Sequence, residues 1–562
     1  MKKKVSLIII VILIMQVVLP LLTVLLKSDF TLVSKAAQMQ EATIDGITWT
    51  YELGGNKVYN LKPKDKNDIY KEIKIPDSIN GSTVVEIGYD AFWGWKNLEK
   101  VTIPESVTTL SSSVFRDCSN LTSVNIPKGV TMIGAWAFCG CSKIDNIEIP
   151  DGITVISRNA FTNCTNLKNL KISDNIEKIM FMAFYECSNL SNIELPNKLK
   201  TIEADVFSGC ESLTSVTIPA SVTSIGSGAF ARCSSLTKIE VSNDNTKYKS
   251  EDGVLFNKES TELMCYPGGK KDTSYIVPSS TTKIWGLAFS GCTNLTSLEI
   301  PNGVTTIGNL AFYYSSITNI KIPNSITSIG QEAFSGCTGL TKIEIPSSVT
   351  KIENYAFNKC ENLTKIAVPS TVTDIGNYAF KACPNITIYC KSNSYAKQYA
   401  EENNIEYCID ETGPKINNVI RNTIDLTRNH VTLTVNAEDN LSGLANEAYS
   451  FDGGETWQKD NYMTYLENKN NITIEVKDSL GNISTYSEVI NITNIIKLEK
   501  GDVNGDGVVD FTDMLEINKH RLGKERLTGK YLEAADVNGD EEVDFKDMLR
   551  INKYRLGKTS TL

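Results

Sequence analysis

Histidine is nearly absent from this sequence. Only two occur in 562 residues, His430 and His520. A histidine general base or a multi-histidine metal site therefore has almost no place to form, and most hydrolase triads and zinc centres are disfavoured. Proline is also scarce, at 16 residues, which excludes a collagenous or mucin-like rod.

The chain also lacks an excess of positive charge. It has 56 basic and 66 acidic residues, a net charge of -10, and no strongly basic subdomain. We therefore expect no nucleic-acid partner. The apolar fraction of 41% is typical of folded protein. Because 562 residues exceed what one core organises, several domains or a repeat array are predicted.

Long hydrophobic runs are limited to the first residues of the chain. Three lysines at positions 2–4 precede a nearly unbroken apolar run from Val5 to Leu26, so residues 1–36 are predicted to be an export signal. Cleavage after Ala36 and retention as a signal anchor both remain open, since about 22 residues also span a bilayer. The rest of the chain is expected outside the cell or on its surface, with membrane contact only through an uncleaved anchor.

A 23-residue period dominates the sequence from about residue 77 to 390. Each copy, as in SLTSVTIPASVTSIGSGAFARC at 212–233, contains one strand-like segment, here LTSVTIP, with alternating apolar positions. A single copy cannot bury its apolar face, so stacked copies with parallel strands are predicted. The repeated phenylalanine occurs twelve times: Phe92, Phe115, Phe138, Phe161, Phe184, Phe207, Phe230, Phe289, Phe312, Phe334, Phe357 and Phe380.

This repeat resembles the bacterial surface leucine-rich repeat family, which includes adhesins. The resemblance implies a mostly β fold, with a leucine-rich-repeat solenoid over residues 77–411. Residues 37–76 are expected to form an N-terminal capping hairpin, and SYAKQYAEENN at 394–404 a closing helix. The longer step between Phe230 and Phe289 predicts a hairpin insert near residues 241–280.

Ten of the 14 cysteines lie three residues after a repeat phenylalanine. An extracellular chain with this many cysteines invites a disulfide framework. Equivalent side chains on successive copies point in parallel, however, so buried thiols are favoured over disulfides. A bridge between Cys390 and Cys408, which lie off this series, stays open.

The outward positions of the repeat strands carry mixed charge and no aromatic residue, which disfavours polysaccharide binding by that face. After the repeats, residues 412–496 contain period-two segments that predict a small all-β sandwich. Its SFDGGETW and VKDSLGNIS strings resemble bacterial immunoglobulin-like modules.

The clearest chemical pattern is a duplicated acidic loop. DVNGDGVVDFTD at 502–513 returns as DVNGDEEVDFKD at 536–547, with oxygen side chains at loop positions 1, 3, 5, 9 and 12. This EF-hand-like spacing predicts two Ca²⁺ sites, with position 7 adding a carbonyl oxygen. Glu541 replaces Gly507 at position 6, so the second site is expected to be weaker. The ligands are Asp502, Asn504, Asp506, Val508, Asp510 and Asp513, then Asp536, Asn538, Asp540, Glu542, Asp544 and Asp547.

Each loop is followed by a segment with helical apolar spacing, and 11 of 14 residues match between FTDMLEINKHRLGK and FKDMLRINKYRLGK. Residues 500–562 resemble a small α-helical type I dockerin, which implies calcium-dependent binding to a cohesin module of a scaffold protein. Near-identity of the halves also suggests that either helix can dock. By the resemblance, the cohesin contacts are Phe511, Thr512, Asn518, Lys519, Phe545, Lys546, Asn552 and Lys553.

These features predict an exported, non-catalytic interaction protein rather than an enzyme. The solenoid would bind a protein or surface target, and the dockerin would attach it to a cellulosome-like scaffold. Two alternatives remain open: an accessory or glycoside-acting component of polysaccharide catabolism, and a host-matrix adhesin. Release of reducing sugar from a glycan panel would favour the enzyme, and pull-down by the solenoid would identify the target.

Overall fold

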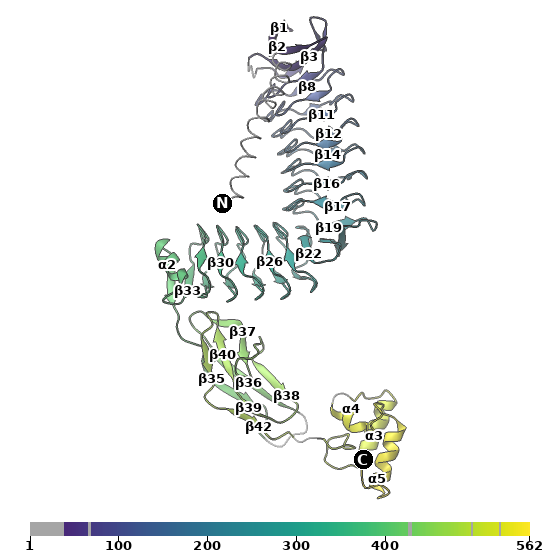
Figure 1. Ribbon diagram of the computed structural model, residues 1–562, viewed down its shortest axis with the longest axis vertical. Coiled ribbons are helices and arrows are strands. Elements are labelled where there is room, and N and C mark those ends of the chain that lie inside the picture. The colour runs from purple at the N-terminus through teal and green to yellow at the C-terminus, as the bar shows by residue number, and fades with distance from the viewer. Residues whose placement is uncertain (1–38, 66–68, 425–429, 496–497, 528–529) are drawn as a thin grey trace, which may run out of the picture. The chain divides into compact units, whose positions relative to one another are not determined.

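The computed structural model describes residues 39–65, 69–424, 430–495, 498–527 and 530–562 (Figure 1). The predicted export signal at residues 1–36 lies outside them. Within the described residues, no helix combines the length and the apolar character needed to cross a membrane.

The repeat region begins with an antiparallel sheet where the capping hairpin is predicted. Strand β1 (Gln40–Ile44) pairs with β2 (Ile47–Gly54), and β2 pairs with β3 (Lys57–Pro63). Strand β3 then pairs in parallel with β6 (Ser82–Val84) and β7 (Glu86–Ile87), while β5 (Ser78–Ile79) pairs with β6. Trp49 and Tyr51 of β2 are buried, so this sheet covers the apolar end of the repeats.

Most copies of the repeat contribute a strand to a first row, which is the predicted LTSVTIP segment. Neighbouring strands pair in parallel one copy apart, as where Val216 lies opposite Ile239. The first row comprises β4 (Glu72–Lys74), β8 (Lys100–Thr102), β10 (Ser123–Val124), β12 (Asn146–Glu148), β14 (Asn169–Lys171), β17 (Ser215–Ile218), β19 (Lys238–Val241), β23 (Ser274–Ile276), β25 (Ser297–Glu299), β27 (Asn319–Lys321), β29 (Lys342–Glu344), β31 (Lys365–Ala367), β33 (Thr387–Cys390) and β34 (Glu406–Ile409).

The prediction of one strand per copy was wrong, because a second row of two-residue strands precedes the phenylalanines. Two residues are too few to show alternation in the sequence. This row continues in parallel from β7, as where Ile284 lies opposite Ile307. It comprises β9 (Thr109–Leu110), β11 (Met132–Ile133), β13 (Val155–Ile156), β15 (Lys178–Ile179), β16 (Thr201–Ile202), β18 (Ser224–Ile225), β24 (Lys283–Ile284), β26 (Thr306–Ile307), β28 (Ser328–Ile329), β30 (Lys351–Ile352) and β32 (Asp374–Ile375).

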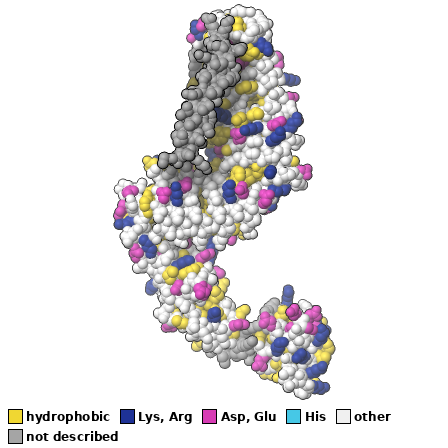
Figure 2. Space-filling view, in the orientation of Figure 1, with side chains coloured by type: hydrophobic (Ala, Val, Ile, Leu, Met, Phe, Trp, Pro, Cys, Tyr) yellow, Lys and Arg dark blue, Asp and Glu magenta, His cyan; other side chains and the backbone are white. Residues whose placement is uncertain are grey.

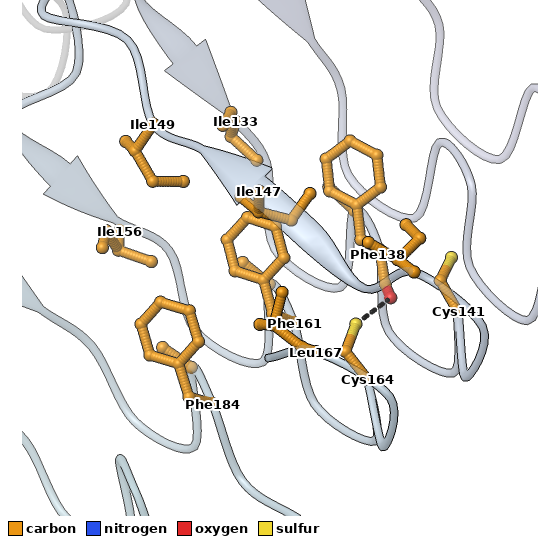
Figure 3. Close-up of a cluster of buried hydrophobic side chains, with 14 of the residues drawn as sticks. Ile133, Phe138, Cys141, Ile147, Ile149, Ile156, Phe161, Cys164, Leu167 and Phe184 are labelled. Atoms are coloured by element: carbon orange, nitrogen blue, oxygen red, sulfur yellow. Dashed lines mark hydrogen bonds between the residues drawn. The ribbon is translucent and has the colours of Figure 1, made fainter. Parts of the chain in front are cut away.

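Stacked phenylalanines form the centre of the repeat core. Phe161 stacks on Phe138 with ring centroids 5.4 Å apart and on Phe184 at 5.3 Å (Figure 3). All three side chains are fully buried. Burial of a phenylalanine contributes about 1.5–3 kcal/mol, a contribution that adds to that of the buried leucine, isoleucine and valine side chains of each copy. The predicted fold class, a mostly β solenoid followed by a small helical region, is confirmed.

The insert combines a hairpin with an additional copy of the repeat. Strand β20 (Tyr248–Glu251) pairs antiparallel with β21 (Val254–Asn257), which is the predicted hairpin. Strand β22 (Glu262–Cys265) then joins the second row in parallel with β24, and β23 joins the first. Tyr266 stacks on Phe289 at 5.4 Å, so it takes the phenylalanine position of a copy that the search for phenylalanine missed.

The repeat cysteines are free thiols that donate hydrogen bonds. Nine donate Sγ–H to the carbonyl oxygen of the phenylalanine one copy earlier, as Cys164 does to Phe138 at 3.2 Å (Figure 3). The tenth, Cys292, donates to Tyr266 at 3.7 Å. All 14 cysteines are unbridged, so the disulfide alternative was wrong. The Cys390–Cys408 bridge is also absent: Cys408 lies opposite Tyr389, which places the two cysteines on opposite faces of the β33–β34 pair.

The solenoid ends with helix α2 (Tyr395–Glu402), where the closing helix is predicted, and Ser394 caps its N-terminus. An antiparallel β region follows, in which β35, β36 and β38 form one sheet and β37, β40 and β41 another. Its separate core includes Val431, Val435, Ile474 and Val476. The strands are β35 (Lys415–Arg421), β36 (Val431–Glu438), β37 (Leu444–Ser450), β38 (Tyr462–Tyr465), β39 (Lys469–Ile472), β40 (Glu475–Asp478), β41 (Ile483–Thr485) and β42 (Ile490–Ile492).

The C-terminal region consists of three helices around a small core. Helices α3 (Phe511–Arg521) and α5 (Phe545–Arg555) follow the two acidic loops, and α4 (Lys530–Ala535) lies between them in sequence. Val503, Ile517, Val537 and Ile551 are buried together. Ile517 and Ile551 occupy equivalent positions in α3 and α5, so the duplicated sequence builds a core in which both halves share.

Candidate calcium and docking site

Each acidic loop ends in the N-terminus of a helix, which fixes two of its carboxylates. Asp510 caps α3 by accepting from the Thr512 backbone N–H, and Asp513 accepts in return from the Asp510 N–H. Asp544 and Asp547 form the same reciprocal pair at the start of α5. The sequence therefore places loop positions 9 and 12 through ordinary helix capping before any metal is considered.

In the first loop, two carboxylates are withdrawn from solvent. Asp513 is fully buried and accepts from the backbone N–H groups of Val503, Asn504 and Asp510. Burial raises its pKa despite these hydrogen bonds. Asp502 is also buried, and its Oδ1 has no hydrogen-bond partner. A buried carboxylate oxygen without a hydrogen-bond partner fits a hard cation, since burying it unpaired is costly.

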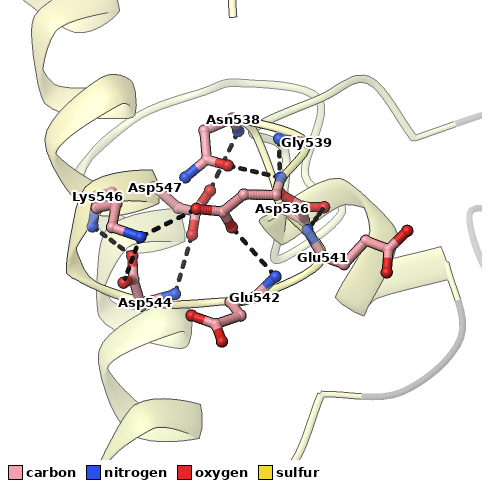
Figure 4. Close-up of polar contacts among 9 residues, drawn as sticks. Asp536, Asn538, Gly539, Glu541, Glu542, Asp544, Lys546 and Asp547 are labelled. Carbon is pink, nitrogen blue, oxygen red and sulfur yellow. Dashed lines mark hydrogen bonds and ion pairs between the residues drawn. The ribbon is translucent and has the colours of Figure 1, made fainter.

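In the second loop, backbone N–H groups also donate to the loop carboxylates, but a lysine ammonium lies beside these carboxylates (Figure 4). Asp536 accepts from the N–H groups of Gly539, Asp540 and Glu541. The Lys546 ammonium lies 3.1 Å from Asp540 Oδ2 and 3.5 Å from Asp544 Oδ2. This ammonium holds the pKa of Asp540 below its usual range. Lys546 therefore forms ion pairs with two carboxylates that are predicted calcium ligands, and it would compete with Ca²⁺ for them. This competition was not predicted from the sequence.

The two loops also differ at position 6, as the sequence predicts. Gly507 has φ +87° and Glu541 has φ +65°. A left-handed conformation is free for glycine but costs a residue with a Cβ about 1–2 kcal/mol. Both loops thus adopt the same turn, and the second does so under strain.

The predicted docking residues lie on α3, α5 and the last loop positions. Phe511 and Phe545 are 59% and 57% exposed, large values for aromatic rings. Thr512, Lys546 and Lys553 are exposed as well, whereas Asn518, Lys519 and Asn552 are half-buried. Exposed apolar residues at two matched positions define the kind of surface that marks a protein contact.

A separate cluster of three aspartates, which the sequence analysis did not identify, lies in the antiparallel β region and in the segment that joins it to the solenoid. Side-chain oxygens of Asp410, Asp439 and Asp478 all lie within 4.8 Å of one another. Asp410 and Asp478 are buried, and burial raises the pKa of Asp478. Backbone N–H groups, such as that of Ser442 to Asp410 at 3.1 Å, supply hydrogen bonds to this group.

The solenoid surface also holds aromatic residues that the search of the strand face missed. They occur in the turns beside the repeat phenylalanines, where Trp93, Tyr314 and Tyr378 are exposed. Cations lie over the rings, as Lys381 does over Tyr378 at 4.9 Å. Figure 2 shows basic and acidic side chains interspersed along the repeat face that it presents, so no single-sign patch marks a target there.

A parallel-strand repeat solenoid that carries duplicated acidic loops defines an interaction protein of the leucine-rich-repeat class. The BspA-type leucine-rich repeat region matches residues 66–187, 154–252 and 264–387, more than half of the sequence. The chain therefore belongs to the BspA-type leucine-rich repeat family. Residues 500–556 match the type I dockerin domain. A comparison with curated proteins gives no match.

Three solved bacterial structures are similar to this chain. A leucine-rich cell surface protein from Faecalibacterium prausnitzii is 28% identical, with 64% of this chain and 97% of that chain covered and a TM-score of 0.52. The pneumococcal vaccine antigen PcpA is 22% identical, with 66% and 99% covered and a TM-score of 0.47. A leucine-rich repeat protein from Bacteroides ovatus is 25% identical, with 66% and 100% covered and a TM-score of 0.40.

Both matched families are non-catalytic interaction modules. Type I dockerins bind calcium and dock onto cohesins, and leucine-rich repeats bind proteins. Both modules are typical of extracellular or surface proteins. The match of residues 500–556 therefore supports calcium as the metal and indicates a cohesin as the partner.

Proposed function

We propose that this chain is an exported, non-catalytic interaction protein with two binding ends. The solenoid binds a protein or surface target, and the dockerin attaches the chain to a cohesin-bearing scaffold, in the manner of a cellulosome component. The observation that carries the proposal is the buried Oδ1 of Asp502, which has no hydrogen-bond partner and which a bound cation compensates.

In this function, each loop holds one Ca²⁺. Position 1, 3, 5, 9 and 12 side chains supply oxygen ligands, and the carbonyl oxygens of Val508 and Glu542 supply position 7. Calcium relieves the repulsion among the carboxylates and keeps α3 and α5 in place. The exposed rings of Phe511 and Phe545 mark two matched surfaces for the cohesin. Thr512, Asn518 and Lys519 belong to the first surface, and Lys546, Asn552 and Lys553 belong to the second.

The test is binding of the full chain to a panel of immobilised cohesins, with Ca²⁺ or with EDTA. We expect a cohesin that binds in Ca²⁺ and is released by EDTA. Phe511→Ala combined with Phe545→Ala should weaken binding at least roughly tenfold, because buried aromatic anchors dominate interface energies. Phe181→Ala, which removes an exposed ring from the solenoid, is the matched control and should leave binding unchanged. Binding that persists in EDTA would contradict the proposal.

A further inference from the structure

The two docking halves are near copies whose differences are almost entirely electrostatic. Residues 511–524 carry three cations and two anions, a net +1 with His520 neutral, whereas residues 545–558 carry five cations and one anion, a net +4. The acidic loop that precedes α5 is itself negatively charged, so the positive charge is confined to residues 545–558. The three differing pairs are Thr512 and Lys546, Glu516 and Arg550, and His520 and Tyr554.

The contacts of one conserved lysine make this difference larger at the surface. On α3, Lys519 Nζ lies 2.8 Å from Glu516 Oε1 and 3.1 Å from Glu525 Oε2, so its charge is matched within the domain. On α5, Arg550 takes the place of Glu516, and Thr559 takes the place of Glu525. Among the described residues, no carboxylate lies within ion-pair distance of Lys553. The α5 surface is thus left with uncompensated cations.

Three apolar pairs are equally exposed on the two surfaces, and the one aromatic difference is Tyr554, which is 39% exposed where α3 has His520. The exposed fractions are 59% and 57% for Phe511 and Phe545, 44% and 42% for Leu515 and Leu549, and 56% and 54% for Leu522 and Leu556. Charge is therefore the main property by which the two surfaces differ, since it changes at two of the three differing pairs. Charges at an interface rim set the association rate and the choice among partners more than the total contact area does.

On the basis of the proposed function, we propose that docking is one-sided. The α5 face, formed by Phe545, Leu549, Arg550, Lys553 and Leu556, binds a cohesin surface rich in carboxylates. The α3 face, where Glu516 and Glu525 neutralise Lys519, does not accept that surface. Near-identity of sequence therefore does not make the two orientations equal in this chain, because like charges opposed across an interface disfavour the rotated orientation.

The test compares two charge reversals at the same helix position in the full, calcium-loaded chain. Arg550→Glu changes the α5 face, and Glu516→Arg changes the α3 face. Association with a cohesin that binds the unchanged chain is measured by surface plasmon resonance at 50 and 500 mM NaCl. We expect Arg550→Glu to slow association roughly tenfold at low salt and the difference to shrink at high salt. Glu516→Arg should leave the rate unchanged, and Arg550→Lys should retain it.

Two measurements keep a negative result interpretable. Circular dichroism and calcium titration of Arg550→Glu establish that the variant folds and loads metal before docking is scored. Equal rates for Arg550→Glu and Glu516→Arg would overturn one-sided docking while leaving the dockerin function intact. A rate that Arg550→Glu lowers equally at both salt concentrations would overturn the electrostatic basis. Failure of the unchanged chain to bind any cohesin in Ca²⁺ would instead refute the proposed function.

Discussion

The guanidinium of Arg232 reaches past one complete repeat to the carboxylate of Glu186. Its Nη2 donates to Glu186 Oε1 at 2.6 Å and to the Tyr185 hydroxyl at 2.8 Å, although 46 residues separate Arg232 from Glu186. Gly209 occupies the same position in the intervening copy. It has φ +78°, and a Cβ there would lie 2.8 Å from the Glu186 carboxyl carbon. The absent side chain is what lets the two charged groups meet.

Tyr314 and Lys359 repeat this arrangement farther along the solenoid. Lys359 Nζ donates to the Tyr314 hydroxyl at 3.0 Å, and Gly336 lies between them, where a Cβ would lie 2.9 Å from the Tyr314 ring. A glycine two residues after the phenylalanine therefore connects the copies on either side of it. The same position in other copies holds residues such as Asp117 and Asn163, which tolerate positive φ.

Gly209→Ala should therefore destabilise the solenoid by two separate mechanisms. The left-handed backbone penalises the new Cβ, and the Cβ displaces Glu186 from Arg232. Together we expect a loss of about 1–3 kcal/mol in the free energy of unfolding, measured by urea denaturation. Gly46→Ala is the matched control, because Gly46 also has φ +78° but no atom lies within 4 Å of its Cβ position. Equal losses in the two variants would show that the Glu186 contact contributes nothing.

The buried thiols should make the solenoid sensitive to alkali. Burial raises the thiol pKa well above its usual value at Cys141, Cys164, Cys187, Cys210 and Cys233. Unfolded thiols ionise near pH 8.5 and these do not, so the folded state binds more protons above that pH. Stability is therefore retained below about pH 8.5 and lost above it, by up to about 1.4 kcal/mol per pH unit for each thiol.

Urea denaturation at pH 7.5, 8.5 and 9.5 measures this loss. The Cys187→Ser variant provides the control, since serine keeps a hydrogen-bond donor toward Phe161 but does not ionise. Its stability should fall less steeply with pH, by one thiol's share. A natural precedent is Ser315, which occupies a cysteine position and is buried. Unchanged stability of the original chain between pH 7.5 and 9.5 would contradict the argument.

The same burial predicts which cysteine reacts first. Cys408 is the one partly exposed cysteine of the 14, and the others are buried. Burial also raises the pKa of Cys139 to about 11, so little thiolate forms there at pH 8. A thiol-disulfide exchange reagent at pH 8 should therefore modify about one thiol per native chain rapidly, and all of them in denaturant. Mass spectrometry identifies the site, and fast modification of Cys164 or Cys187 would refute the buried arrangement.

Periodicity carried most of the fold prediction. Phe138, Phe161 and Phe184 stack as their 23-residue spacing indicates, because identical apolar faces have only their neighbours to pack against. The second row of strands was not predicted, because a strand of two residues is too short to show the alternation of apolar and polar side chains. The copy that contains Tyr266 was missed for two reasons: tyrosine replaces the phenylalanine, and the hairpin places it 13 residues beyond the position that a 23-residue step from Phe230 predicts. A search for a regularly spaced phenylalanine therefore finds the regular copies and misses the copy in which Tyr266 takes its place.

The calcium loops show a different limit of sequence reasoning. Spacing alone placed Asp502 and Asp513 in one loop, since helix capping and turn residues are local properties. The ion pair of Lys546 with Asp540 could not be predicted in this way, because it depends on where a long flexible side chain settles. For the same reason, the pairing of Lys519 with both Glu516 and Glu525 emerged only in three dimensions.

Glu541→Gly should strengthen calcium binding at the second loop. Metal binding and loop ordering are coupled, so the backbone strain of Glu541 at φ +65° lowers the calcium affinity of the loop. Removing about 1–2 kcal/mol of strain should raise the affinity of the second loop roughly five- to thirtyfold, as measured by calorimetric titration of calcium into the full chain. The matched control is Glu542→Gly, which removes the neighbouring carboxylate but not the strained position. If Glu542→Gly raises the affinity as much as Glu541→Gly does, lost negative charge, and not backbone strain, sets the difference between the loops.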